Sequence, residues 1–201
     1  MPKKKYSYSK DDRPRRKIKP KFLIVTEGER EDAYFRFFEK QSYDCLIDVD
    51  IVPRDQNKSA PKHVQDRLEA YKENQKWLPD SEDQIWFVFD VDKWGKQIHE
   101  LKDLCEMTRN WNIAISNPCF EVWLHNHNPS VVEGVETCED LKRELHTQTL
   151  GHFKIEIYAP QIATAIVNSK AADTHPDHVF PGPLQTKVYK LAESLLAILN
   201  K

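Results

Sequence analysis

Residues 85–89, Ile-Trp-Phe-Val-Phe, constrain the fold more than any other part of the chain. Every position is apolar, so both faces of an extended strand would be buried, which is typical of a central strand covered by helices on each side. Asp90 and Asp92 follow, and alternation along a strand places residues two apart on the same face. The sequence therefore predicts a buried central strand whose carboxyl end carries two like charges close together.

Strand and helix patterns alternate along the first 120 residues. Apolar and β-branched runs predict strands, and apolar residues at helical spacing predict the helices between them. The expected strands are residues 22–26, 47–52, 85–89 and 112–116, and the expected helices are residues 30–40, 61–77 and 98–107. Because right-handed crossovers return each helix over the sheet, this order predicts an α/β fold with a mainly parallel four-stranded sheet flanked by helices.

Beyond Pro118 the pattern is helical. Helices are expected at about residues 120–124, 137–147 and 155–170, and a final helix presents an apolar stripe between Val188 and Leu199. We expect these helices to form a C-terminal extension packed on the sheet edge. The predicted organisation is a basic flexible arm over residues 1–20, an α/β core over 21–130 and the helical extension over 131–201.

The first 21 residues concentrate basic charge. They hold ten Lys or Arg and two Asp, a net charge of +8, whereas the whole chain has −2, so the remainder carries −10. Such an arm commonly follows a phosphate backbone, because Lys and Arg displace condensed counterions, although short charged termini are also often only solvated tails. The candidate nucleic-acid contacts are Lys3, Lys4, Lys5, Arg13, Arg15, Arg16, Lys17, Lys19 and Lys21.

Several other classes of site and location are disfavoured. The chain has no apolar run long enough to span a bilayer and no secretory signal, so we expect a cytoplasmic protein without membrane contact. Five glycines leave no Gly-rich phosphate loop. The four cysteines (Cys45, Cys105, Cys119 and Cys138) form no CxxC pair, which favours buried free thiols over disulfides or a zinc site. His125 and His127 are interpreted as an exposed polar cluster, not as metal ligands.

Acidic side chains follow three of the four expected strands. Glu27 comes just past the first strand beside Gly28, Asp90 and Asp92 follow the third, and Glu121 follows the fourth. Gly28 would allow a tight turn that holds Glu27 over the crevice where open parallel sheets bind ligands. Carboxylates this close together would repel one another. Mg²⁺ prefers a few carboxylates with water and substrate phosphate as ligands, so a bound metal ion would replace the repulsion by coordination. Stabilisation of helix dipoles would explain any one of these acids, but it explains Asp90 poorly.

The order of these motifs resembles two known groups. An apolar strand ending in Glu-Gly, followed about 60 residues later by one ending in Asp-x-Asp, resembles the Toprim domain of topoisomerases, bacterial primases and the nucleases of the overcoming-lysogenization-defect group. More closely, the chain is similar to the RloB-like family, named for reading frames linked to restriction loci, in KPKFLIVTEGEREDAYFRFF, WFVFDVDKW, AISNPCFEVWLHNH and QTKVYKLAESL. The resemblance covers residues 17–200 and implies a Toprim-like core.

The resemblance also implies a metal-dependent site that handles phosphodiesters, in a family associated with defence against phage. It places Glu27 where Toprim proteins keep a general acid or base, and Asp90 and Asp92 where they hold Mg²⁺. Glu121 falls in the family's own motif and is assigned a supporting metal role beside Glu27. Lys154, in GHFKIEIY, resembles a lysine of the same family and would neutralise charge on a scissile phosphate.

We therefore expect a nuclease that uses Mg²⁺ or Mn²⁺ and acts on DNA, RNA or tRNA. A partner protein of a defence system is a further expectation. The apolar final helix is equally compatible with a monomer and with a homo-oligomer.

Two other functions stay open. An apolar strand followed by Asp-x-Asp is also the first motif of the haloacid-dehalogenase-type phosphatases, in which the first Asp is a phosphorylated nucleophile. That motif usually lies near the start of its domain and carries Thr or Val where Trp94 stands here, and it leaves Glu27 unused. The other candidate is a non-catalytic component of a restriction or retron-type system, in which the basic arm alone binds nucleic acid or a partner.

Overall fold

A computed structural model of the protein describes residues 19–42, 48–54, 60–91, 95–128, 134–148 and 154–200. Its strands are β1 (Lys21–Thr26), β2 (Asp48–Ile51), β3 (Gln84–Asp90), β4 (Trp111–Asn117) and β5 (Gln185–Thr186). They form one sheet in the order β2-β1-β3-β4-β5, in which β1 to β4 are parallel and β5 is antiparallel to β4. The predicted α/β fold and its four parallel strands are confirmed. The two-residue strand β5 was not predicted, because it is too short to carry a hydrophobic pattern.

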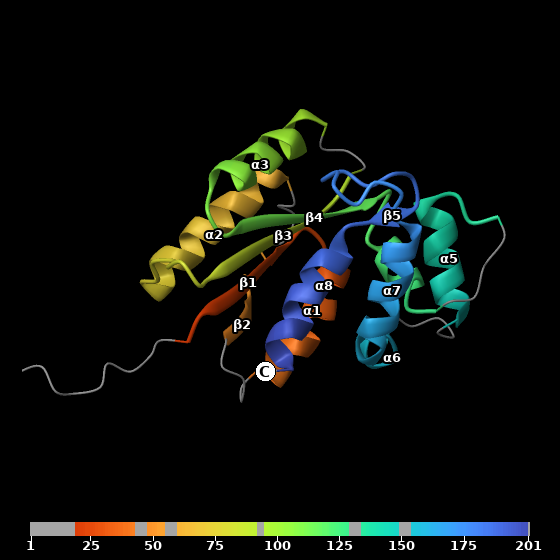
Figure 1. Cartoon of the computed structure of the whole chain (residues 1–201), viewed down its shortest axis with the longest axis horizontal. Helices are drawn as coiled ribbons and strands as arrows, with labels where there is room; N and C mark the ends of the chain where they lie inside the picture. Colours follow the sequence, from red (N-terminus) through yellow and green to blue (C-terminus); the bar gives the residue numbers. More distant parts are fainter. Residues whose placement is uncertain are drawn as a thin grey trace, which may run out of the picture.

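Helices cover both faces of the sheet (Figure 1). They are α1 (Glu29–Gln41), α2 (Pro61–Gln75), α3 (Lys96–Met107), α4 (Glu121–His125), α5 (Cys138–Gln148), α6 (Ile155–Tyr158), α7 (Ile162–Ala172) and α8 (Val188–Leu199). The helix expected over residues 155–170 is interrupted by a 3-10 turn, η1 (Ala159–Gln161), that contains Pro160, which lacks the backbone N–H that a continuous helix needs. Within the described ranges, no helix is long and apolar enough to cross a membrane.

Side chains of β1 and β3 alternate between two apolar layers, as the apolar run at residues 85–89 predicts. One layer buries Phe22, Ile24, Trp86 and Val88 against α1 and α8. The other buries Leu23, Val25, Ile85, Phe87 and Phe89 against α2 and α3. The interpretation of residues 85–89 as a central strand covered on both sides is therefore confirmed.

Helix α8 lies on the same face of the sheet as α1, not on the sheet edge where the C-terminal helices were expected (Figure 1). The crossovers through α2 and α3 cover the opposite face of the sheet. Helix α1 alone would therefore leave exposed much of the sheet face on which it packs. The apolar stripe of α8, which includes Val188, Leu191 and Leu195, closes that gap. The C-terminal segment thus supplies part of the core and, through β5, part of the sheet.

His127 is a buried member of the aromatic core, so its predicted place in an exposed cluster is wrong. It is 1% exposed, its Nδ1 lies 2.9 Å from the Trp123 carbonyl oxygen, and its Nε2 lies 2.9 Å from the Tyr34 hydroxyl. A neutral ring satisfies both partners by donating from Nδ1 and accepting at Nε2. Burial lowers the pKa of His127 to about 4, against the hydrogen bonds with the backbone of Trp123 and Leu124, which raise it.

Acid should destabilise the protein partly through His127. Its pKa rises from about 4 in the folded chain to 6.5 in the unfolded chain, so the unfolded state gains the proton first as the pH falls. The contribution of the neutral ring to the free energy of unfolding is fully present above pH 6.5 and is lost towards pH 4. The loss is about 2–3 kcal/mol in total. Urea unfolding at pH 7 and pH 4.5 should show this loss in the wild type and a smaller one in His127→Gln. Equal losses in both proteins would contradict the assignment.

Candidate functional site

The acidic cleft lies at the point where the strand order reverses. The chain passes from β1 to β2 on one side and then crosses back to β3 on the other side of β1. Helices α1 and α2 consequently lie on opposite faces, which opens a crevice at the carboxyl ends of β1 and β3. A cavity of about 560 Å³ occupies this position. Its walls carry the carboxylates of Glu27, Glu31, Asp90 and Glu121 and the cations of Arg30, Arg54 and Lys142.

Glu27 and Asp90 meet in this cleft, as expected from their places at adjacent strand ends. The Glu27 N–H donates to the Val88 carbonyl oxygen at 3.1 Å, which extends the pairing of β1 with β3 by one residue. The Asp90 N–H donates to Glu27 Oε2 at 3.2 Å. Glu27 is 7% exposed, and Asp90 is half-buried. The backbone of the sheet therefore fixes both residues at the same edge.

Glu121, the first residue of α4, brings a third carboxylate to the cleft. It is 4% exposed, and one of its oxygens is paired with the Arg30 guanidinium of α1. Its other oxygen lies 3.7 Å from the Cys138 sulfur. The predicted meeting of Glu27, Asp90 and Glu121 at one cleft is thus what the fold produces.

Glu31 is a fourth carboxylate of the cleft, and it was not predicted from the sequence. It is 5% exposed, in the first turn of α1. Burial and, to a smaller extent, the nearby carboxylates of Glu27 and Glu121 raise the pKa of Glu31 to about 7, although a backbone hydrogen bond and Arg54 act to lower it. The four-residue spacing from Glu27 across Gly28 was the available signal, but acids in a first helical turn are common without any site.

Glycine is required at position 28 because the Glu31 side chain approaches it closely, and not because of the backbone conformation of Gly28. Its φ of −111° and ψ of 172° are open to any residue, so the predicted need for a special turn is not what selects glycine here. A Cβ at this position would overlap Glu31 Oε2. The absence of a side chain at Gly28 thus leaves the space that the Glu31 carboxylate occupies.

Gly28→Ala should therefore displace the Glu31 carboxylate while the fold persists. We expect Mn²⁺ affinity, measured by calorimetry, to fall by about tenfold to a hundredfold, because displacements of about 1 Å have effects of that size in preorganised sites. The free energy of unfolding should change by less than about 1 kcal/mol, because only the end of a flexible side chain has to move. Unchanged metal affinity would contradict this explanation of the glycine.

Three cations surround the carboxylates, and two of them have acidic partners. Arg30 pairs with Glu121, and Arg54 Nη1 lies 3.6 Å from Glu29 Oε1 on the exposed side of α1. Lys142 reaches the cleft from α5. Buried carboxylates with cations around them suit a ligand that combines a metal ion with phosphate.

Other predicted site residues lie away from the cleft or outside the described residues. Lys154 is exposed, precedes α6 and does not line the cleft. Lys19 and Lys21 lie at the amino end of β1, and Lys21 Nζ donates to Asp50 Oδ2 at 3.1 Å and to the Tyr71 hydroxyl at 2.7 Å. Outside the described ranges lie Asp92, Lys3, Lys4, Lys5, Arg13, Arg15, Arg16 and Lys17.

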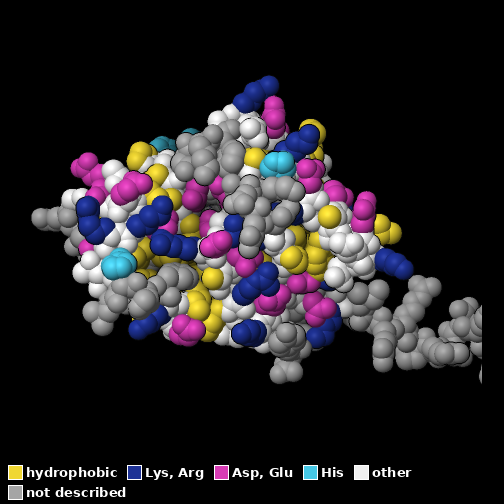
Figure 2. All heavy atoms as spheres, turned by 180° about the vertical axis from the view of Figure 1, so that it is seen from behind, with side chains coloured by type: hydrophobic (Ala, Val, Ile, Leu, Met, Phe, Trp, Pro, Cys, Tyr) yellow, Lys and Arg dark blue, Asp and Glu magenta, His cyan; other side chains and the backbone are white. Residues whose placement is uncertain are grey.

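Basic and acidic side chains are interspersed on the face seen in Figure 2. The described part of this face thus has no equivalent of the concentrated positive charge in residues 1–21. Nucleic-acid binding by the arm stays a prediction.

Two of the four cysteines form a disulfide, so the prediction of free thiols is wrong for this pair. Cys119, just before α4, is bonded to Cys138, the first residue of α5, although 19 positions separate them. The packing of α5 against α4 brings them together, which sequence spacing does not reveal. Cys105 is a buried free thiol as expected, and Cys45 lies outside the described residues.

The comparison with known families gives one match. The family model described as RloB-like protein matches residues 22–195, which include β2 to β5, all of β1 except Lys21, and every carboxylate of the cleft. No curated protein and no solved structure matches the chain.

Proposed function

The chain belongs to the RloB-like protein family, and from this premise and the acidic cleft we propose that it is a Toprim-like nuclease. It would hydrolyse phosphodiester bonds of nucleic acid with Mg²⁺ or Mn²⁺, as part of a defence against phage. The observation that carries the proposal is the cluster of four carboxylates, of which Glu27, Glu31 and Glu121 are buried, at the carboxyl ends of β1 and β3.

The donor set of the cleft fits a hard divalent cation. Carboxylate oxygens are the ligands preferred by Mg²⁺ and Mn²⁺, and like charges buried together are costly without a cation between them. Glu27, Glu31 and Asp90 would hold the metal, with Asp92 and Glu121 as further candidates. The raised pKa of Glu31 supports this choice, because it reflects first the burial of the carboxyl and then repulsion by the carboxylates of Glu27 and Glu121.

Different side chains of the cleft would carry out proton transfer and phosphate binding. Bound there, Mg²⁺ or Mn²⁺ would polarise a phosphoryl oxygen and lower the pKa of a bound water. Glu27 takes a proton from the attacking water or gives one to the leaving oxygen. Arg30, Arg54 and Lys142 bind the oxygens of the scissile phosphate and its neighbours. Lys142 lines the cleft, whereas Lys154 remains a second candidate for the lysine role.

The first test is cleavage by the purified protein with Mg²⁺, Mn²⁺ or EDTA. The substrates are supercoiled plasmid, single-stranded DNA, total RNA and tRNA, with p-nitrophenyl phosphate as a phosphatase substrate. We expect metal-dependent strand cleavage that Asp90→Asn abolishes and Asp66→Asn, an exposed aspartate on α2, retains. Equal cleavage by Asp90→Asn would contradict the proposal.

Two other outcomes would favour the alternatives. Release of p-nitrophenol without strand cleavage would favour a phosphatase in which Asp90 is the nucleophile. Metal binding without cleavage of any substrate would favour a component that acts through its arm or with a partner protein, and deletion of residues 1–20 would then distinguish these two cases.

A further inference from the structure

The Cys119–Cys138 disulfide lies in the wall of the acidic cleft. Cys119 is 4% exposed, whereas Cys138 is half-buried, so Cys138 is the more accessible member of the pair for a small thiol. Cys105 differs from this pair. It is buried between α3 and the sheet, and burial raises the pKa of its thiol to about 12, which makes it unreactive.

The disulfide is one of the contacts that hold α5 at the cleft. The apolar cluster between α4 and α5 has three buried members, Cys119, Val122 and Leu141, so the bonded cysteine is itself part of the packing. Leu145 adds a contact of α5 with the main core. Lys142 lies four residues, about one turn, after Cys138 and also lines the cleft. Opening the disulfide therefore loosens the helix that positions a phosphate-binding cation.

Opening it also changes the surroundings of a carboxylate. Glu121 Oε2 lies 3.7 Å from the Cys138 sulfur, and both sulfurs and this carboxylate lie within 4.8 Å of one another. A disulfide sulfur has no proton to donate, whereas a Cys138 thiol would donate to Glu121 and compete with Arg30 or a metal for that carboxylate.

We propose that Cys119 and Cys138 form a reversible redox switch of the acidic cleft, in which the disulfide holds α5 and Lys142 in place and the dithiol releases them. For its effect on cleavage the proposal rests on the proposed nuclease function. Closing the switch removes two electrons and two protons from the two thiols, and a low-molecular-weight disulfide accepts them as its own S–S bond becomes two thiols. In the reverse reaction a thiolate attacks the Cys138 sulfur, Cys119 leaves as a thiolate that takes up a proton, and a second thiol completes the reduction.

The test compares the full-length protein in oxidised and reduced glutathione buffers. Alkylation and mass spectrometry should find Cys119 and Cys138 changing state together. Amide exchange in α5 should be at least about tenfold faster in the dithiol form, because local opening loses a covalent restraint. Metal-dependent cleavage should be at least about fivefold faster in the disulfide form, a modest effect because Lys142 is displaced and not removed.

Matched variants separate this switch from general effects of the buffer. Cys119→Ser/Cys138→Ser should exchange and cleave like the reduced protein in both buffers, and Cys105→Ala should respond like the wild type. Identical α5 exchange in both buffers would overturn the switch, as would measurable cleavage at equal rates by the two forms. Stoichiometric zinc binding by the reduced protein that rigidifies α5 would overturn it in favour of a metal site. Faster exchange on reduction without cleavage in either form would retain the switch and reject the nuclease instead.

Discussion

Replacing Glu31 by glutamine is expected to stabilise the metal-free protein and to slow metal-dependent cleavage by about a hundredfold or more. Its carboxyl has a pKa of about 7 in the folded chain, against an ordinary 4.5, so ionisation costs folding free energy as the pH rises through this window. Glutamine has no charge to bury and keeps the shape. At pH 8 we expect a gain of about 2 kcal/mol in the free energy of unfolding.

Thermal unfolding with and without Mn²⁺ measures both effects in one experiment. Metal should raise the melting temperature of the wild type, because it binds only the folded state, and should raise that of Glu31→Gln much less. Glu29→Gln is the matched control, since Glu29 lies in the same helical turn with a side chain that is 88% exposed. Cleavage by Glu31→Gln at the wild-type rate, with an unchanged response to metal, would show that Glu31 lies outside the metal site.

The parallel sheet and the meeting of Glu27 with Asp90 could be predicted because both follow from local patterns. Long apolar runs identify β1 and β3, and adjacent parallel strands must end at the same edge. Glu31 could not be predicted in the same way, because its role depends on burial beside Gly28 and on the nearby carboxylates of Glu27 and Glu121, and in sequence it resembles any acid at a helix start.

Contacts between distant segments account for the other differences. The bond between Cys119 and Cys138 depends on how α5 packs on α4, and no short motif records that packing. The place of α8 depends on which face the crossovers leave open, which only the completed sheet decides. The sequence around His127 is polar, which favoured an exposed position. In the fold, His127 packs against the rings of Tyr34 and Trp123.

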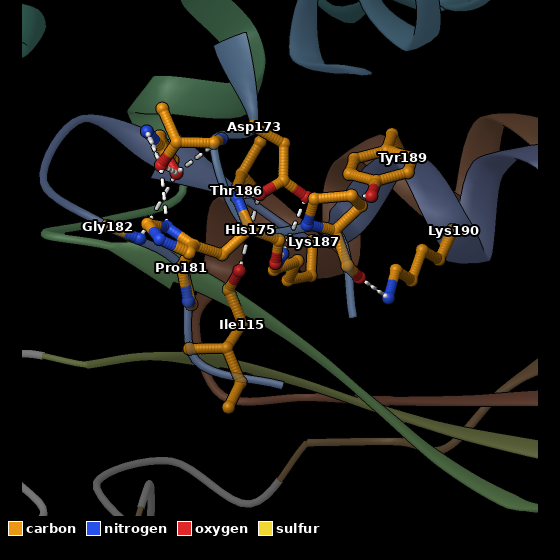
Figure 3. Close-up of polar contacts among 12 residues, drawn as sticks. Ile115, Asp173, His175, Pro181, Gly182, Thr186, Lys187, Tyr189 and Lys190 are labelled. Carbon is orange, nitrogen blue, oxygen red and sulfur yellow. Dashed lines mark hydrogen bonds and ion pairs between the residues drawn. The ribbon is translucent and has the colours of Figure 1, made fainter. Parts of the chain in front are cut away.

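Lys187 is a further residue whose importance is visible only in the fold. Its side chain is 1% exposed, and its Nζ donates to Asp173 Oδ2 at 2.5 Å and to the His175 carbonyl oxygen at 2.7 Å (Figure 3). The Tyr189 hydroxyl donates to the same Asp173 oxygen at 2.7 Å. Burial opposes ionisation of Asp173, but these hydrogen bonds outweigh it and lower the pKa of its carboxyl. The backbone N–H of Lys187 also donates to the Ile115 carbonyl oxygen of β4, so the network attaches the segment before α8 to the sheet.

Lys187→Met is expected to lower the free energy of unfolding by about 3–5 kcal/mol, because it leaves the Asp173 carboxylate buried without its cation. Lys190→Met is the control, since Lys190 is partly exposed and its Nζ donates to the Pro176 carbonyl oxygen, and it should cost less than about 1 kcal/mol. Adding Asp173→Asn to Lys187→Met should recover part of the loss, since the unpaired charge is then gone. Urea unfolding of the four proteins at pH 7 measures these differences. A loss below about 1 kcal/mol in Lys187→Met would show that water reaches Asp173 and that the pair is not what anchors this segment.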